Sequence, residues 1–264
     1  MGYIDLHVHA IPGLDDGVKD DLEALKLLEC AVKSHIDVMV LATHKEPNGR
    51  FDHDNATVLK AAKQLKKLAS THQLPIKFLV GEELRIKTDT IDVIRKGKYL
   101  GLEGTDYVQI ELTRTNAQSK LVDQAIEELK AQGKKIIIVH PERYFDDVRE
   151  GVEHVKRWVE AGCIMELNRT SLLNLHGEMA YKLSHKLLKV GLAHVVASDA
   201  HQGEGVRVCR LDDVETSLIK NYSAHLADML LRVNPQRILD NEDPLPITKP
   251  KRRLFHLFIR KEKA

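Results

Sequence analysis

Tyr3-Ile4-Asp5-Leu6-His7-Val8-His9 begins the chain with a short apolar run that ends in two histidines. Six more apolar runs follow, each with a histidine or an acidic residue near its end; they span residues 38–44, 76–83, 107–111, 136–141, 164–168 and 194–201. Runs of this length and composition are typical of buried strands. Parallel α/β barrels bring the carboxyl ends of their strands together at one end, so these polar residues are expected to meet there.

Amphipathic helical patterns lie between the apolar runs, with apolar residues three and four positions apart. They cover residues 22–32, 58–68, 121–129, 152–159 and 179–188. Alternating strands and helices imply parallel pairing with crossover helices. We therefore expect an α/β barrel with seven strands, one fewer than usual, in a single catalytic domain over residues 1–248, followed by a tail over residues 249–264.

Composition and charge exclude several classes of protein. The 264 residues carry 40 Lys+Arg and 39 Asp+Glu, and this balance predicts no nucleic-acid partner. Three widely spaced cysteines predict neither a disulfide framework nor a structural zinc site, and they fit a reducing cytoplasm. The sequence has no signal-peptide pattern and no apolar run of 18 residues, so we expect a cytoplasmic protein without a membrane span.

Nine residues at the ends of the runs or in the turns after them can offer nitrogen or oxygen ligands to a metal. They are His7, His9, Asp16, His44, Glu83, Glu111, His140, Asp199 and His201. A single member of this set could cap a helix or face solvent, but nine such coincidences at one end of a barrel are not expected. Nine ligands without a thiolate favour manganese, iron or zinc at a site with more than one ion. The other nine of the 14 histidines are expected at the surface or in packing contacts.

Several of these motifs resemble those of the polymerase-and-histidinol-phosphatase (PHP) superfamily. They are His7-Val8-His9, Thr43-His44, Gly81-Glu82-Glu83, Ile110-Glu111, His140-Pro141-Glu142-Arg143-Tyr144 and Ser198-Asp199-Ala200-His201. A narrower resemblance is to the bacterial metal-dependent tyrosine phosphatases of capsule and exopolysaccharide gene clusters, the CpsB/YwqE type. It is carried by Ile11-Pro12-Gly13-Leu14-Asp15-Asp16-Gly17, Ala42-Thr43-His44, Asn48-Gly49-Arg50-Phe51 and His140-Pro141-Glu142-Arg143. The motifs occur in the family's order over nearly the whole chain.

The resemblance implies a distorted seven-stranded (βα) barrel of the PHP type, TIM-barrel-like, with three divalent metal ions. Manganese is expected first, with iron or zinc as alternatives. The family pattern assigns the first ion to His7, His9, Glu83 and Asp199, and Glu83 bridges to a second ion held by Glu111 and His140. It assigns the third ion to Asp16, His44 and His201. Asp16 matches the family position better than Asp15.

The same resemblance assigns two arginines to the predicted site. Arg143 follows His140 by three residues and matches the family arginine that contacts the substrate phosphate. A second family arginine lies just after the Asp-x-His motif, and Arg207 is the nearest candidate, displaced by about one residue. This displacement leaves the role of Arg207 open, because it could be a solvated loop charge, just as Arg143 could cap a helix. Asn168 ends the sixth run at the same edge, where it could support a ligand or simply begin the following loop.

The implied function is hydrolysis of phosphotyrosine on a protein by a metal-activated water. The expected substrate is the membrane-associated tyrosine kinase of polysaccharide assembly. Metal ions activate water and neutralise charge on phosphate oxygens. A tyrosine phenol has a pKa of about 10, so its departure depends little on a strong general acid.

Two other functions stay open, and a third is disfavoured by the sequence. The same metal site could act on a small phosphorylated metabolite such as histidinol phosphate, or it could belong to an adaptor that binds a kinase without hydrolysis. Cys163 and Arg169 also have the Cys-x5-Arg spacing of cysteine-dependent tyrosine phosphatases. The residues between them form an apolar strand that contains Glu166, which argues against a phosphate-binding loop.

The segment 249–264 is strongly basic, with seven Lys and Arg residues around an apolar group that includes Leu254, Phe255 and Phe258. Such a pattern suits the anionic face of a membrane or an acidic partner. A solvated tail is the alternative. We therefore expect this segment to make peripheral contact with the inner face of the membrane.

Overall fold

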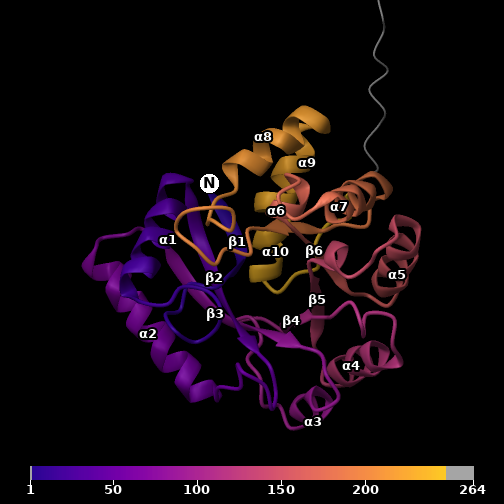
Figure 1. Cartoon of the computed structure of the whole chain (residues 1–264), viewed down its shortest axis with the longest axis horizontal. Coiled ribbons are helices and arrows are strands. Elements are labelled where there is room, and N and C mark those ends of the chain that lie inside the picture. The colour runs from indigo at the N-terminus through magenta and orange to yellow at the C-terminus, as the bar shows by residue number, and fades with distance from the viewer. Residues whose placement is uncertain (1, 248–264) are drawn as a thin grey trace, which may run out of the picture.

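The structure is a computed structural model that describes residues 2–247, so the basic tail at 249–264 lies outside the described residues. Seven strands form one parallel sheet in the order of the sequence (Figure 1). They are β1 (Tyr3–Val8), β2 (Ile36–Lys45), β3 (Lys77–Arg85), β4 (Tyr107–Glu111), β5 (Lys135–Val139), β6 (Ile164–Asn168) and β7 (Val195–Ala197). The seven-stranded α/β fold predicted from the sequence is confirmed.

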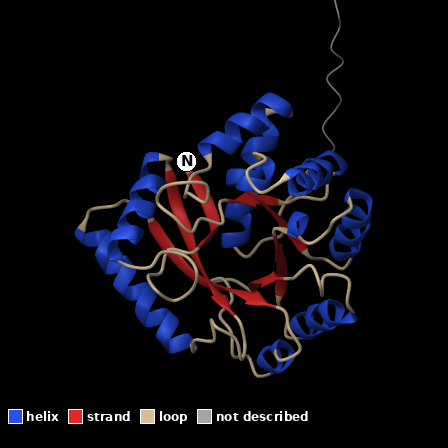
Figure 2. Cartoon of the chain, viewed as in Figure 1, coloured by secondary structure: helices blue, strands red, loops and turns tan. Residues whose placement is uncertain are grey.

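Helices surround the strands on the outside of the barrel (Figure 2). The five expected helices are present as α1 (Asp21–Lys33), α2 (Asn55–Thr71), α4 (Lys120–Ala131), α5 (Val148–Glu160) and α7 (Glu178–Val190). Shorter elements not expected from the sequence are α3 (Thr90–Arg95), η1 (Pro141–Arg143), α6 (Arg169–Leu172), α8 (Asp212–Asn221), α9 (Ala224–Asp228), η2 (Met229–Val233) and α10 (Asn234–Leu239). Asp20, Asp54 and Asp147 cap α1, α2 and α5 by accepting backbone N–H bonds.

The barrel is incompletely closed between its first and last strands. Only an isolated bridge joins Val8 to Ala200, with the His9 amide donating to the Ala200 carbonyl at 2.9 Å. The π-helical turn η2 packs against both β1 and β7, and α10 packs against β1. The turn η2 therefore lies against both end strands, whereas Ile238 of α10 packs in the interior apolar cluster.

Side chains that face the barrel interior change from apolar to polar along each strand. On β4 the interior positions are Tyr107, Gln109 and Glu111, since residues two apart share a face. On β1 the pairing register shifts between Asp5 and Val8. Ile4 and Leu6 belong to the interior apolar cluster, but His7 and His9 both reach the polar end, because this irregularity switches the alternation. The strand thus continues through Val8, between the two histidines.

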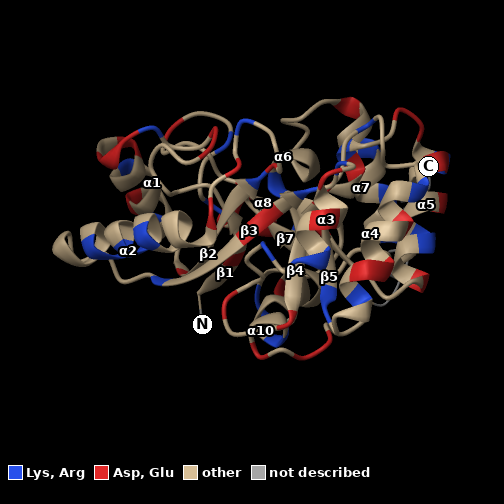
Figure 3. Cartoon of the chain, turned by 90° about the horizontal axis from the view of Figure 1, so that it is seen from below, with Lys and Arg blue, Asp and Glu red and all other residues tan. Residues whose placement is uncertain are grey.

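Charge is distributed without a dominant sign over the described surface. Figure 3 shows basic and acidic residues interspersed along the helices. Within residues 2–247, no helix has the length and apolar character that crossing a membrane requires.

Candidate metal centre

All nine candidate ligands lie together at the carboxyl end of the barrel. They form four overlapping groups, and within each group one ligand atom from every member lies within 4.8 Å of the others. The groups are His9, Asp16, His44 and His201; His7, Glu83 and His140; His7, His9 and Asp199; and His44, Glu83 and Glu111. The structure thus brings the nine residues together, whereas their division among individual ions stays a prediction.

Glu83 lies at the middle of this cluster. Its Oε2 atom is 3.4 Å from Nε2 of both His7 and His9 and 2.9 Å from Nδ1 of His44. Its Oε1 atom is 3.0 Å from Nε2 of His140. One carboxylate therefore contacts four imidazoles, a position that suits a bridging ligand.

Asp16 connects the two histidines on the other side of the cluster. Its Oδ1 atom lies 3.3 Å from Nε2 of His44 and 3.2 Å from Nε2 of His201. The Asp16 side chain is about half exposed, whereas both histidines are buried. Asp16 therefore forms the solvent-facing edge of the centre.

The residues of this cluster fit divalent cations. Buried polar atoms almost always find a hydrogen-bond partner, but His44 Nδ1, Glu83 Oε2 and His201 Nε2 have none within the described residues. Their close contacts lack the direction of a hydrogen bond, and all three atoms point into the cluster. Nitrogen and oxygen donors without a thiolate match manganese, iron or zinc. Burial lowers the pKa of both His140 and His201 to about 4, which keeps them in the neutral form that coordinates metal.

A second layer of residues fixes the orientation of three histidines. His7 Nδ1 lies 2.7 Å from Glu166 Oε1, and His9 Nδ1 lies 2.7 Å from Asp15 Oδ2. His140 Nδ1 lies 3.1 Å from the Tyr144 hydroxyl. These contacts turn Nε2 of each ring toward the centre, as is usual for metal ligands. Sequence reasoning missed the roles of Asp15 and Glu166, although Glu166 lies on the interior face of β6.

Glu111 is held by an arginine that the sequence did not single out. Arg85 donates from Nε to Glu111 Oε2 at 2.6 Å and from a terminal nitrogen to Oε1 at 3.2 Å. Arg85 follows Glu83 by two residues on β3, so it shares the face of that ligand. The two-residue spacing between Glu83 and Arg85 was the sequence signal from which a role for Arg85 in the site could have been predicted.

Arg143 and Arg207 converge on the two oxygens of Asp199. Arg143 donates to Oδ2 at 2.7 Å and Arg207 donates to Oδ1 at 2.9 Å. Asn168 donates to Oδ2 at 2.7 Å, so the carboxylate has three donors. The displaced Arg207 therefore lies beside Arg143. Two positively charged guanidinium groups next to the ligand cluster can together hold a phosphoryl group.

Two of the candidate ligands have backbone conformations that residues other than glycine rarely adopt. The φ angle is 35° at His140 and 52° at Asp199. His140 directly follows β5, and Asp199 lies two residues after the end of β7. Such strain persists where the surrounding structure holds a functional group in place.

Cys163 and Arg169 do not form a phosphate-binding loop. Cys163 is buried, and burial raises the pKa of its thiol to about 12. Arg169 donates to both oxygens of Asp213, at 2.9 and 2.5 Å. The thiol is therefore protonated at neutral pH and the arginine is already paired, so the covalent cysteine route has no support in the structure.

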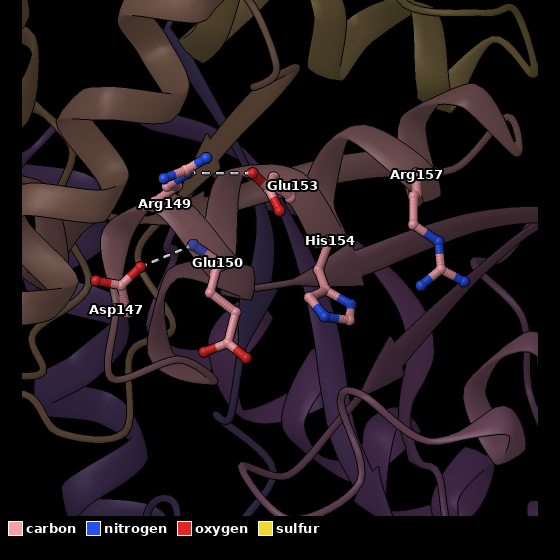
Figure 4. A pocket seen from close by; sticks show the side chains of 6 residues that line it. All are labelled: Asp147, Arg149, Glu150, Glu153, His154 and Arg157. Atoms are coloured by element: carbon pink, nitrogen blue, oxygen red, sulfur yellow. Dashed lines mark hydrogen bonds and ion pairs between the residues drawn. The ribbon is translucent and has the colours of Figure 1, made fainter.

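Two surface hollows differ in their relation to the centre. One of about 330 Å³ begins at Asp16 and His201 and is lined further out by Lys19 and Lys26 of the α1 region. A larger one of about 550 Å³ lies along α5 (Figure 4). Its lining contains none of the nine ligands, and Figure 4 marks two contacts within it, Arg149 with Glu153 and the Glu150 amide with Asp147. Of these two hollows, the first is therefore the one that reaches the candidate ligands.

Comparison with known proteins identifies the family. Residues 3–240 match the family model described as capsular polysaccharide synthesis, CpsB/CapC. The tyrosine-protein phosphatase YwqE of Bacillus subtilis is 29% identical over 97% of this chain and 100% of its own length. The tyrosine-protein phosphatase CpsB of Streptococcus agalactiae serotype III is 26% identical over 90% and 98%.

Solved structures agree with these sequence matches. A crystal structure from work on YwqE of Bacillus subtilis and CpsB of Streptococcus pneumoniae, described as unique metal-dependent tyrosine phosphatases, superposes with a TM-score of 0.84. It has 28% identity and covers 94% of this chain and 98% of its own. A dihydropyrimidinase from Brevibacillus agri, at 11% identity and a TM-score of 0.52 over 91% and 71%, shares the fold alone. The chain belongs to the CpsB/CapC family of capsular polysaccharide synthesis proteins.

Proposed function

We propose that this protein is a metal-dependent phosphatase that hydrolyses phosphotyrosine on a protein substrate. The observation that carries the proposal is the convergence of nine buried or partly buried ligands with two arginines at one end of the barrel. Family membership supports the reaction class, because the relatives are named tyrosine-protein phosphatases.

The proposal assigns three divalent ions, with manganese first, to the ligand sets expected from the family pattern. Divalent cations held there supply Lewis acidity that activates water and neutralises the phosphate. Glu166, Asp15 and Tyr144 keep the histidines in the coordinating orientation. When substrate binds, Arg143 and Arg207 donate charge-assisted hydrogen bonds to the phosphoryl oxygens, because the planar guanidinium matches the geometry of a phosphate.

An extended protein substrate suits the shape of the site better than a small metabolite. The centre has a partly exposed edge at Asp16, and the hollow that begins there is lined mainly by polar and charged side chains. A metabolite enzyme commonly encloses its ligand within a pocket. We infer that the substrate is a phosphotyrosine segment of the tyrosine kinase of polysaccharide assembly, in the cytoplasm.

Purified protein assayed in parallel with a phosphotyrosine peptide and with histidinol phosphate tests this function. We expect the peptide to be the better substrate by kcat/KM. Preference for histidinol phosphate would support the metabolite alternative. Tight binding of phosphopeptide without turnover, in protein loaded with metal, would support the adaptor alternative.

We also propose that residues 249–264 bring the enzyme to an anionic membrane surface. The proposal rests on the sequence alone, with seven basic residues that each contribute about 1 kcal/mol near such a surface. Co-sedimentation of the full chain and a 1–248 truncation with anionic vesicles should differ at low salt and converge at high salt. Equal sedimentation of the two forms at low salt would contradict it.

A further inference from the structure

Two exposed apolar side chains lie in loops close to the two arginines assigned to phosphate binding. One loop carries Arg207, and the other follows α6, whose Thr170 contacts Arg143. Leu175, in the loop between α6 and α7, is 47% exposed, and Val206, between β7 and α8, is 49% exposed. Six large apolar residues are at least 41% exposed in the described part of the chain, and two of them lie here. We call Leu175 and Val206 the apolar rim.

Backbone contacts bring the two loops to the same place. The Leu175 amide donates to the Thr170 carbonyl at 2.8 Å, and the Arg169 guanidinium donates to the Val206 carbonyl at 3.0 Å. Arg169 and Thr170 are neighbours at the start of α6 (Figure 1). Both halves of the apolar rim are thus attached to one short helix.

The same helix contacts the arginine pair. Thr170 Oγ1 accepts a hydrogen bond from Arg143 at 3.2 Å, and Arg207 directly follows Val206 in the chain. His176, next to Leu175, has its pKa lowered to about 4, first by burial and then by the charges of Arg143 and Arg207. The loop that holds Leu175 therefore lies within the electrostatic field of both arginines.

The ligand cluster is buried behind Arg143 and Arg207, so a phosphate held by both would have its ester group on the solvent side, where the two loops lie. Exposed apolar surface at that point favours a flat hydrocarbon ring over a charged or hydrated chain. Resting on the proposed function, we propose that Leu175 and Val206 contact the phenyl ring of phosphotyrosine and make the enzyme select aryl over alkyl phosphate esters.

Phe51 is the rival position for the substrate ring. Its ring stacks on His44, with centroids 5.6 Å apart and an angle of 14° between planes, and the Arg50 guanidinium lies 5.1 Å from its centroid. The surface of this ring is thus already engaged by neighbours within the protein. Leu175 and Val206 are each about half exposed, which favours the apolar rim as the contact surface.

Competitive inhibition by phenylphosphonate and methylphosphonate measures ring binding apart from chemistry, because neither compound has a leaving group to lose. The variants are Leu175→Ser, Val206→Ser and the double variant, assayed with a phosphotyrosine peptide as the substrate. Leu59→Ser on α2 is the matched control, since Leu59 is 48% exposed and lies on another element. Thermal unfolding checks that each variant is folded.

We expect wild-type protein to bind phenylphosphonate more tightly than methylphosphonate. The double variant should lose about fivefold of this preference, as expected when an aryl ring loses part of an apolar contact. Leu59→Ser should keep the wild-type ratio, and methylphosphonate affinity should be similar in all forms.

An unchanged ratio in the folded double variant would overturn the inference. So would loss of the preference in Phe51→Ala with the apolar rim intact, which would place the ring beside His44. Failure of the wild type to hydrolyse the phosphotyrosine peptide would instead count against the proposed function, so the two failures are distinguishable.

Discussion

The two ends of the barrel are built by the same strands but bury opposite kinds of side chain. At the amino end, Ile4, Val195 and Ile238 pack in an apolar cluster. At the carboxyl end, His7 and Glu83 are buried just as completely. Burying the first group stabilises the fold, whereas burying polar groups costs free energy unless they are paired or bind metal. The amino end of the barrel therefore contributes mainly to stability, and the carboxyl end contributes mainly to function.

The largest effect on activity is expected from Glu83→Gln at the carboxyl end. A neutral amide removes the carboxylate that contacts four imidazoles, so cation binding loses its central ligand. We expect kcat/KM to fall by about a hundred- to a thousandfold or more. Steady-state kinetics with circular dichroism checks this, and Glu153→Gln on the exposed face of α5 is the control. Near wild-type turnover would break the assignment of Glu83.

Arg143→Ala should separate substrate binding from metal binding. Removal of its guanidinium should lower kcat/KM by roughly ten- to a thousandfold, because charge-assisted hydrogen bonds are worth about 1.5–3 kcal/mol and more in the transition state. Metal content measured by elemental analysis should stay unchanged. Exposed Arg149→Ala on α5 serves as the control. A defect explained entirely by lost metal would refute the phosphate-binding role.

Glu166→Gln should have a smaller effect at the same end. Its carboxylate lies 2.7 Å from His7 Nδ1, so the substitution weakens the orientation of that ligand without removing it. We expect apparent Mn²⁺ affinity to fall by about ten- to a hundredfold, with activity restored by excess metal. Activity titrated against Mn²⁺ gives the midpoint. A midpoint equal to that of the wild type would show that Glu166 does not support His7.

Ile238→Ala tests the amino end, where no effect on catalysis is expected. Ile238 of α10 is fully buried in the apolar cluster, and its truncation should reduce the free energy of unfolding by about 2–5 kcal/mol. Activity per folded molecule at 25 °C should not change. Denaturant unfolding measures the loss, and Ile219→Ala, 42% exposed on α8, should change it by less than about 0.5 kcal/mol. A large fall in kcat with an unchanged free energy of unfolding would contradict the assignment of stability to the amino end and of function to the carboxyl end.

Much of this fold could be predicted because strands and ligands follow local patterns. The seven runs and five long helices have clear periodicity, and parallel strands necessarily bring their carboxyl ends together. That geometry is why His7 and Asp199, 192 residues apart in the sequence, could be placed in one cluster. The elements α8, α9, η2 and α10 are short, and the packing of η2 against β1 and β7 is a tertiary property with no local signal.

The parts of the site that sequence reasoning missed also depend on tertiary contacts. Glu166 faces inward because of its position on β6, but its pairing with His7 requires β1 and β6 to face each other across the barrel. The position of Arg207 depends on the course of the β7–α8 loop, which spacing alone could not define. The register shift in β1 likewise comes from strand pairing and not from composition.

The most direct test of the metal-centre account is removal and return of metal in a phosphotyrosine peptide assay. Purified protein and its Cys163→Ser variant are treated with a chelator, desalted, assayed, and assayed again after addition of Mn²⁺, with metal content measured at each stage. The account predicts that both forms lose activity with the metal and regain it as about three ions per chain return. Full activity in metal-free protein, or an inactive Cys163→Ser variant that retains its metal, would contradict it.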